Sequence, residues 1–129
     1  MLELRRSAAI IIKDKKIMLV RQKGKKYFNL PGSSPKENES IEDALQRGLS
    51  ELDLKPKKFK FFNTFLGESS EDKNLYIIDT FLVIPEKYEP ISKDFEVKWL
   101  NGKDLDNLEM HFLIKEQIIP ELKRLKAID

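Results

Sequence analysis

The sequence predicts a single α+β domain in which helices pack against a mixed, mostly antiparallel sheet. Short β-prone segments flank one strongly helical segment, and a second helical pattern closes the chain. The five glycines and six prolines are scattered as breaks, without a linker or an internal repeat. With 129 residues, 40% of them hydrophobic, the chain suits one core, so we expect one domain over residues 1–129.

The chain is expected to begin with a β-hairpin. Ser7–Ile12 and Ile17–Gln22 are rich in apolar and β-branched side chains, and the charged segment Lys13–Lys16 lies between them. Leu30–Pro35 contains two prolines and a glycine. We expect this segment to interrupt all regular structure.

A helix is predicted after this loop. Ser40 is a suitable N-cap, and the acidic residues Glu42 and Asp43 in the first turn complement the helix dipole. Pro56 marks the end of the helical pattern. The residues at helical spacing are Ile41, Ala44, Leu45, Gly48, Leu49 and Leu52.

The second half is expected to complete the sheet and to close it with a helix. Further strands are predicted at Phe59–Leu66, Leu75–Ile84 and Phe95–Leu100. The polar loop Gly67–Asn74 separates the first two of these strands. Asp104–Leu108 is expected to form a short helical turn, and Met110–Lys126 a helix with a kink near Pro120.

Composition excludes several classes of function. The chain has no cysteine, which rules out disulfides, thiolate metal sites and thiol nucleophiles, and its single histidine, His111, cannot build a histidine-based metal site. A net charge of +2 gives no strong field for a polyanion. The longest apolar run, Ala8–Ile12, is too short to cross a bilayer, so we expect no membrane partner and a cytoplasmic location.

One segment carries a recognisable motif. Leu30–Leu54 reads LPGSSPKENESIEDALQRGLSELDL. This segment resembles the Nudix box, in which a Gly, a Glu, and an Arg-Glu-apolar-x-Glu-Glu run follow one another at fixed spacing. The residues that fall on the box positions are Ser33, Glu39, Arg47, Leu49 and Glu51.

The resemblance extends over nearly the whole chain and implies a Nudix-like α/β/α sandwich. It also implies kinship to pyrophosphohydrolases that cleave nucleoside-diphosphate-linked compounds with Mg²⁺ or Mn²⁺. On this basis Glu51, Arg47 and Glu39 are candidate catalytic residues, and Glu51 with Glu96 are candidate metal ligands. The candidate substrate-binding residues are Phe28, Leu30, Pro31 and Gly32.

The sequence differs from the Nudix box at two positions where the family has chemically active residues. Gly48 and Leu52 stand where the family has glutamates, so Glu51 is left alone of three clustered acids. We therefore expect a nucleotide-like small-molecule ligand with weak or lost hydrolysis, and a need for Mg²⁺ or Mn²⁺ only if the protein is active. Gly48 also has a purely structural interpretation, close packing against a strand, and Leu52 is also explained as a core residue.

Alternatives remain open at this point. The chain is an active Mg²⁺-dependent hydrolase if off-box carboxylates such as Glu96 supply the missing acids. A solvated charged loop is the simpler interpretation of Glu68, Glu71 and Asp72. The basic stretches Lys23–Lys26 and Lys55–Lys60 contain or lie next to aromatic residues, namely Tyr27, Phe28, Phe59, Phe61 and Phe62. This combination suits nucleic acid less well than an edge strand protected by lysines. An RNA-contacting or protein-interaction module is the least favoured function, and a homodimer is compatible with the sequence.

Overall fold

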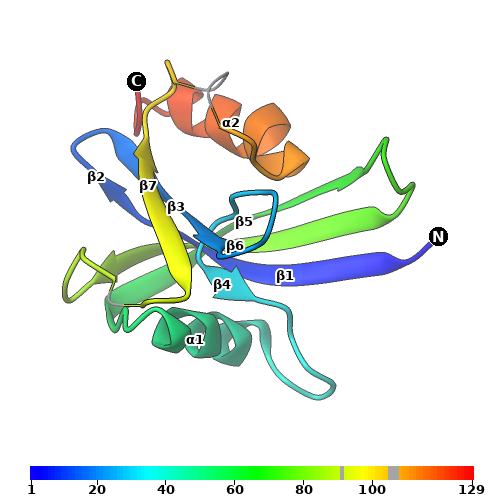
Figure 1. The fold of residues 1–129 in the computed structure, drawn as a ribbon, viewed down its shortest axis with the longest axis horizontal. Helices are drawn as coiled ribbons and strands as arrows, with labels where there is room; N and C mark the ends of the chain where they lie inside the picture. Colours follow the sequence, from blue (N-terminus) through cyan, green and yellow to red (C-terminus); the bar gives the residue numbers. More distant parts are fainter. Residues whose placement is uncertain (91, 105–107) are drawn as a thin grey trace.

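The computed structural model describes residues 1–90, 92–104 and 108–129. Figure 1 shows strands forming a central layer, with one helix on each side of it. The four-stranded sheet has the order β4 (Gly32–Ser33), β1 (Glu3–Ile10), β6 (Leu75–Pro85), β5 (Pro56–Glu68). The three-stranded sheet has the order β2 (Ile12–Lys13), β3 (Lys16–Gln22), β7 (Phe95–Leu100). The predicted α+β sandwich is confirmed.

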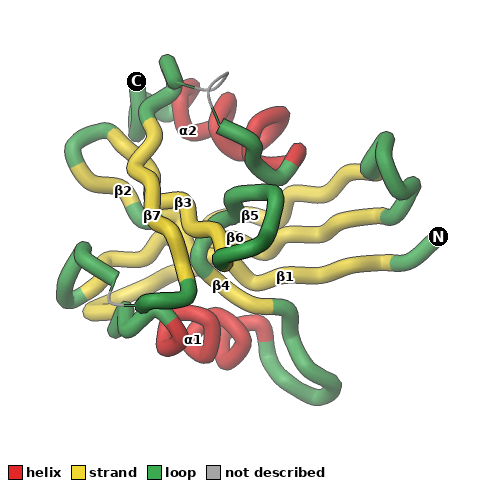
Figure 2. Tube along the Cα trace, viewed as in Figure 1, coloured by secondary structure: helices red, strands yellow, loops and turns green. Residues whose placement is uncertain are grey.

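The core has two parts because strand residues alternate between the two faces of the layer. Figure 2 shows the two helices on opposite sides of the strands. In β1, Ala9 faces α1 (Ile41–Glu51), together with Phe81 from β6. The neighbouring Ala8 and Ile10 face the opposite side, where α2 (Ile119–Arg124) covers them. Both helices are thus held by apolar side chains from the same strands.

The expected N-terminal hairpin is only partly right. The turn is present, with positive φ angles of 53° at Asp14 and 63° at Lys15, and β2 and β3 pair across it. However, β1 ends at Ile10 and belongs to the other sheet, where it runs parallel to β6. The chain passes from one sheet to the other at Ile11, whose carbonyl accepts a hydrogen bond from the Met18 amide of β3 at 2.9 Å.

The expectation that Leu30–Pro35 lacks regular structure is wrong at its centre. Gly32 and Ser33 form the short strand β4, which pairs antiparallel with β1. A Cβ atom at Gly32 would lie 2.9 Å from the Cα of Ala8 and closer still to the Ser7 carbonyl. Only glycine therefore lets the loop approach β1 this closely.

The closing helix runs over residues 112–124, slightly shorter than predicted. Its middle, η2 (Ile114–Ile118), is a π-helical segment, and Pro120 sits in the first turn of α2 directly after it. A proline lacks the N–H that a regular helix would use, which accounts for a widened turn here. The helical turn predicted at Asp104–Leu108 falls largely outside the described residues. Among the described residues, no helix has the length and apolar character to cross a bilayer.

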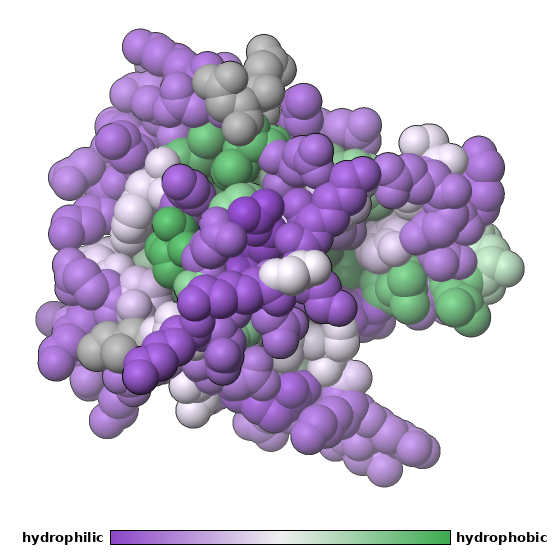
Figure 3. Space-filling model, in the orientation of Figure 1, coloured by the Kyte–Doolittle hydropathy of each residue, from purple (hydrophilic) through white to green (hydrophobic). Residues whose placement is uncertain are grey.

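The face of the molecule seen in Figure 3 is mostly hydrophilic. The predicted edge strand is present, since β5 forms one border of its sheet and carries exposed lysines. Exposed apolar side chains include Met1, Leu2 and Leu66, and Figure 3 shows hydrophobic atoms at the end where the N-terminus lies.

Candidate functional site

Helix α1 begins as the sequence predicts. The Ser40 side chain accepts a hydrogen bond from the Asp43 amide at 3.0 Å, which satisfies one of the free amides of the first turn. The helix ends at Glu51, and Asp53 follows with a φ of 53°. This cap and this turn fix where the box residues lie relative to the loop before them.

Glu39 and Arg47 form a clasp between that loop and α1. The Arg47 Nε and Nη2 atoms donate to the two carboxylate oxygens of Glu39 at 3.1 and 2.9 Å, and Nη2 also donates to the Ser34 carbonyl at 2.8 Å. The Lys36 amide donates to Glu39 at 2.9 Å. The hydrogen bonds from Arg47 and then from Lys36 lower the pKa of Glu39 to about 2. Glu39 is therefore a charged, fully engaged carboxylate that positions the loop.

Glu51 is the acid of the box that reaches a cavity. It is exposed at the end of α1 and lines a cleft of about 270 Å³ between β1, β3 and the loop before α1. We call this the Glu51 cleft. Its lining includes Arg6, Arg21, Lys25, Asn29, Gly32 and Glu51.

Gly48 and Leu52 do not face open space. A Cβ atom at Gly48 would lie 2.5 Å from the Gly32 carbonyl oxygen and closer to its carbon, so α1 rests directly on β4 at this point. The structural interpretation of Gly48 as a close-packing residue is thus confirmed. Leu52 is only 2% exposed and packs with Leu45 and Leu49 in the core beneath α1.

A partly buried cation lies beside Glu51 in the cleft. Arg6 comes from β1, and its Nη2 atom donates to the carbonyls of Leu30 and Gly32 at 3.0 and 3.1 Å. Its Nε atom is buried without a hydrogen-bond partner among the described residues. Burial lowers the pKa of Arg6, while the negative charge of Glu51 acts in the opposite direction.

Glu96 is placed away from α1, on β7. There it lies opposite Arg21 in the register of β3 and β7, and Arg21 Nη2 donates to both of its carboxylate oxygens at 2.9 Å. The Arg21 guanidinium also lies 4.6 Å from the centre of the Phe28 ring. The Glu96 carboxylate is therefore bound by Arg21 and does not share a metal site with Glu51 in this structure.

The candidate substrate-binding residues divide between core and cleft. Phe28 and Leu30 are 1% and 0% exposed and belong to the core near α2, and Pro31 is also buried. Gly32 lines the Glu51 cleft, as does Asn29 between the two buried side chains.

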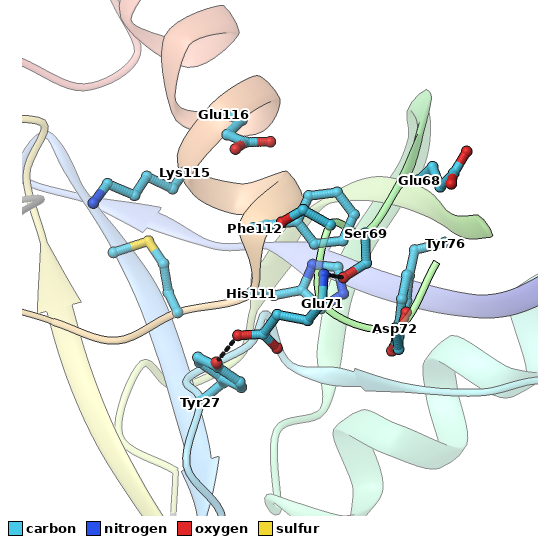
Figure 4. A pocket seen from close by; sticks show the side chains of 12 residues that line it. Tyr27, Glu68, Ser69, Glu71, Asp72, Tyr76, His111, Phe112, Lys115 and Glu116 are labelled. Carbon is cyan, nitrogen blue, oxygen red and sulfur yellow. Dashed lines mark hydrogen bonds between the residues drawn. The ribbon is translucent and has the colours of Figure 1, made fainter. Parts of the chain in front are cut away.

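A second cavity, of about 360 Å³, lies next to the Glu51 cleft and shares Tyr27 with it. We call it the aromatic pocket; Figure 4 shows its side chains converging from the β5–β6 loop and the start of the closing helix. Its main lining residues are Tyr27, Glu71, Asp72, Tyr76, His111 and Phe112. The hydroxyl of Tyr27 donates to Glu71 at 2.8 Å, and that of Tyr76 donates to Asp72 at 2.6 Å.

Three rings of this pocket contact one another: His111 stacks on Phe112, and Tyr76 meets both of them edge-to-face. His111 lies 4.9 Å from Tyr76 and 4.8 Å from Phe112, measured between ring centres. Burial, and then the charge of Arg6, lowers the pKa of His111 to about 4, so its ring is neutral at pH 7. The hydrogen bond from Tyr76 to Asp72 raises the pKa of Tyr76 to about 12. The pocket therefore presents neutral rings beside acidic oxygens.

The residues do not fit the metal site that the family resemblance implies. Hard divalent cations need several oxygen ligands, and α1 offers Glu51 while Gly48 has no room for a side chain and Leu52 is buried. Among the described residues, no group of three or more His, Cys, Asp or Glu side chains is placed to share a cation.

Sequence reasoning missed Arg6 and most of the aromatic pocket. Arg6 shares the face of β1 that carries Ala8 and Ile10, so a charged residue at a core-facing position was the available signal. The contact of Tyr76 with His111 joins positions far apart in the chain, and no local pattern encodes it.

Comparison with known proteins places this architecture in a family. The chain is 43% identical over 102 residues to an 8-oxo-dGTP diphosphatase of Buchnera aphidicola subsp. Schizaphis graminum, covering 74% of this chain and 75% of that protein. Solved structures of Nudix hydrolases superpose on it, among them one from Nitrosomonas europaea with a TM-score of 0.71 over 98% of this chain and 91% of that chain, at 16% identity. The chain belongs to the Nudix hydrolase superfamily.

Other Nudix structures support the same fold. A MutT structure described for Aliivibrio salmonicida and Vibrio cholerae has a TM-score of 0.72 at 18% identity, covering 95% of this chain and 98% of that chain. The MutT Nudix hydrolase of Burkholderia pseudomallei has a TM-score of 0.70 at 19% identity, covering 87% of this chain and 93% of that chain. No protein-family model matches the chain. In this Nudix protein the fold is thus retained.

Proposed function

We propose that this Nudix protein binds a nucleotide-like ligand across its two adjoining cavities and hydrolyses it weakly or not at all. The observation that carries the proposal is the contrast between the cavities on either side of Tyr27. Three cations, Arg6, Arg21 and Lys25, line the Glu51 cleft, whereas aromatic rings in contact with one another line the aromatic pocket.

Each cavity suits one part of a nucleotide. Guanidinium and ammonium groups bind phosphate oxygens through charge-assisted hydrogen bonds, which favours phosphates in the Glu51 cleft. Aromatic rings stack on bases, and the carboxylates of Glu71 and Asp72 can accept hydrogen bonds from the N–H groups of a base. We infer that the base enters the aromatic pocket and that Gly32 and Asn29 border the linking sugar and phosphates.

Efficient hydrolysis needs more than the box provides. Pyrophosphate cleavage requires charge neutralisation at the phosphates and a group that activates water. Glu51 is the remaining acid for either task, and Arg47 and Glu39 are assigned to positioning because they hold each other. Losing a water-activating group commonly lowers a rate by about 10²–10⁴-fold.

An active hydrolase is the second candidate, favoured by the name of the 43%-identical relative, an 8-oxo-dGTP diphosphatase. In that case Glu51 and Glu96 are the metal ligands, and Arg21 must release Glu96 when substrate and Mg²⁺ bind. RNA contact, a homodimer and a cytoplasmic location stay predictions.

The two candidates differ in turnover. We expect dGTP and 8-oxo-dGTP to raise the melting temperature, while phosphate or pyrophosphate release with Mg²⁺ or Mn²⁺ stays near background. Robust turnover that Glu51→Gln abolishes and Glu42→Gln leaves intact would overturn the proposal in favour of the active hydrolase. Glu42 is a matched control because it lies exposed in the first turn of the same helix.

A further inference from the structure

Arg6 is placed unusually for a strand arginine. It points toward the core-facing side of β1, and two of its hydrogen bonds go to the backbone carbonyls of Leu30 and Gly32. Its Nε atom has no partner among the described residues and is buried. A guanidinium in this position carries a full positive charge, and neutral carbonyls only partly compensate it.

The negative charge of Glu51 acts on Arg6 through space rather than through a hydrogen bond. Because both residues line the same cleft, the cleft holds a chain-borne cation next to the box acid that remains. Burying a charge is costly unless a counter-charge accompanies it. An anionic group entering the cleft would supply that counter-charge.

The same atoms disfavour a metal ion. Backbone carbonyls are ligands for hard cations, but the Leu30 and Gly32 oxygens accept hydrogen bonds from Arg6 instead. Beside them, the backbone of Gly32 fills the space that a side chain at Gly48 would need. A divalent cation there would also be repelled by the guanidinium.

We propose that Arg6 replaces the divalent cation in this protein, so that the Glu51 cleft binds the phosphate groups of its ligand without metal. The inference rests on the proposed nucleotide binding and adds how the phosphates are held. Arg6 provides the interior positive charge, and Lys25 provides a second cation at the exposed mouth of the cleft. Arg21 contributes less, because Glu96 already occupies its Nη2 donor.

Calorimetric titration with dGMP, dGDP and dGTP tests this in the wild-type protein. We expect affinity to rise with the number of phosphates and the dissociation constants in excess EDTA to lie within about threefold of those in Mg²⁺. Arg6→Met should weaken dGTP binding in EDTA by about tenfold or more and flatten the dependence on phosphate number. Arg6→Lys keeps the positive charge but loses the planar guanidinium with its paired N–H donors. Its affinity for dGTP should therefore lie between those of the wild type and Arg6→Met.

The matched control is Arg124→Met, because Arg124 is an exposed arginine in α2 paired with Glu121. It should leave all three affinities unchanged. The comparison of EDTA with Mg²⁺ needs no variant, so it remains decisive even if Arg6→Met fails to fold. Binding that appears only with Mg²⁺ would overturn the role of Arg6 and leave nucleotide binding intact. Absence of binding to all three nucleotides in both buffers would overturn the proposed function itself and this inference with it.

Discussion

At the residue scale, Gly48 sets how closely α1 approaches β4. A glycine inside a helix usually lowers stability by about 1 kcal/mol relative to alanine. Here the added Cβ atom would meet the backbone of Gly32, which cannot move without disturbing β1. For the same reason, glutamates introduced at Gly48 and Leu52 would not rebuild the family's acid cluster on this backbone.

We therefore expect Gly48→Ala to destabilise the protein by about 1–3 kcal/mol, the usual effect of overpacking. Urea denaturation followed by circular dichroism measures the change. Ser50→Ala, at an exposed position of the same helix, is the control and should have little effect. A Gly48→Ala protein as stable as the wild type would mean that α1 and β4 are further apart than described.

His111 gives the protein a pH-dependent stability. Its folded pKa is about 4, against 6.5 for a free histidine, because of burial and the charge of Arg6. Between these pH values the unfolded chain binds a proton that the folded protein does not, so the free energy of unfolding decreases as the pH falls from 6.5 to 4. Above pH 6.5 this group has no effect on stability.

The expected loss is on the order of 1–2 kcal/mol, less than the full pKa shift converts to, since the ring is partly exposed. Urea melts at pH values from 4 to 7 should show this slope in the wild type, and His111→Gln should remove it. An unchanged slope in His111→Gln would assign the effect to other groups.

At the element scale, the clasp between Glu39 and Arg47 joins α1 to the loop that borders the Glu51 cleft. The spacing of the box predicted both residues, and the helix and its N-cap were also predicted because they depend on local chemistry. The helix ends at Glu51, earlier than the expected end at Pro56. β4 was missed because its pairing with β1 depends on a close approach at Gly32 that only the tertiary structure defines.

The clasp should contribute stability that disappears in acid. The folded pKa of Glu39 is about 2, below its ordinary 4.5, so its contribution is complete above pH 4.5 and is lost as the pH falls toward 2. We expect Glu39→Gln to have a lower melting temperature than the wild type near pH 7, with the difference shrinking below pH 4.5. Glu42→Gln serves as control and should differ little. A constant difference at all pH values would show that the clasp acts through shape rather than charge.

At the scale of the whole molecule, the split into two sheets produces the cavities. The sequence predicted most strands, but it assigned β1 to a hairpin with β3, because neighbouring strands in the chain usually pair. In the structure β1 leaves that hairpin at Ile11 and pairs with β6. That crossover brings Arg6 beside the loop of Gly32, which is why neither the cleft nor its partly buried cation could be located from local patterns.

The parallel pairing of β1 with β6 also orders events during protein synthesis. Arg5 pairs with Ile77 and Ile10 with Leu82, so β1 lacks its long partner until residues 75–85 have been synthesised. Until then the apolar run from Ala8 to Ile11 has no finished sheet to join. Pairings over such long separations slow folding and prolong exposure of strand edges. The nascent chain of this protein is therefore most open to aggregation or chaperone capture along β1, before residues 75–85 emerge.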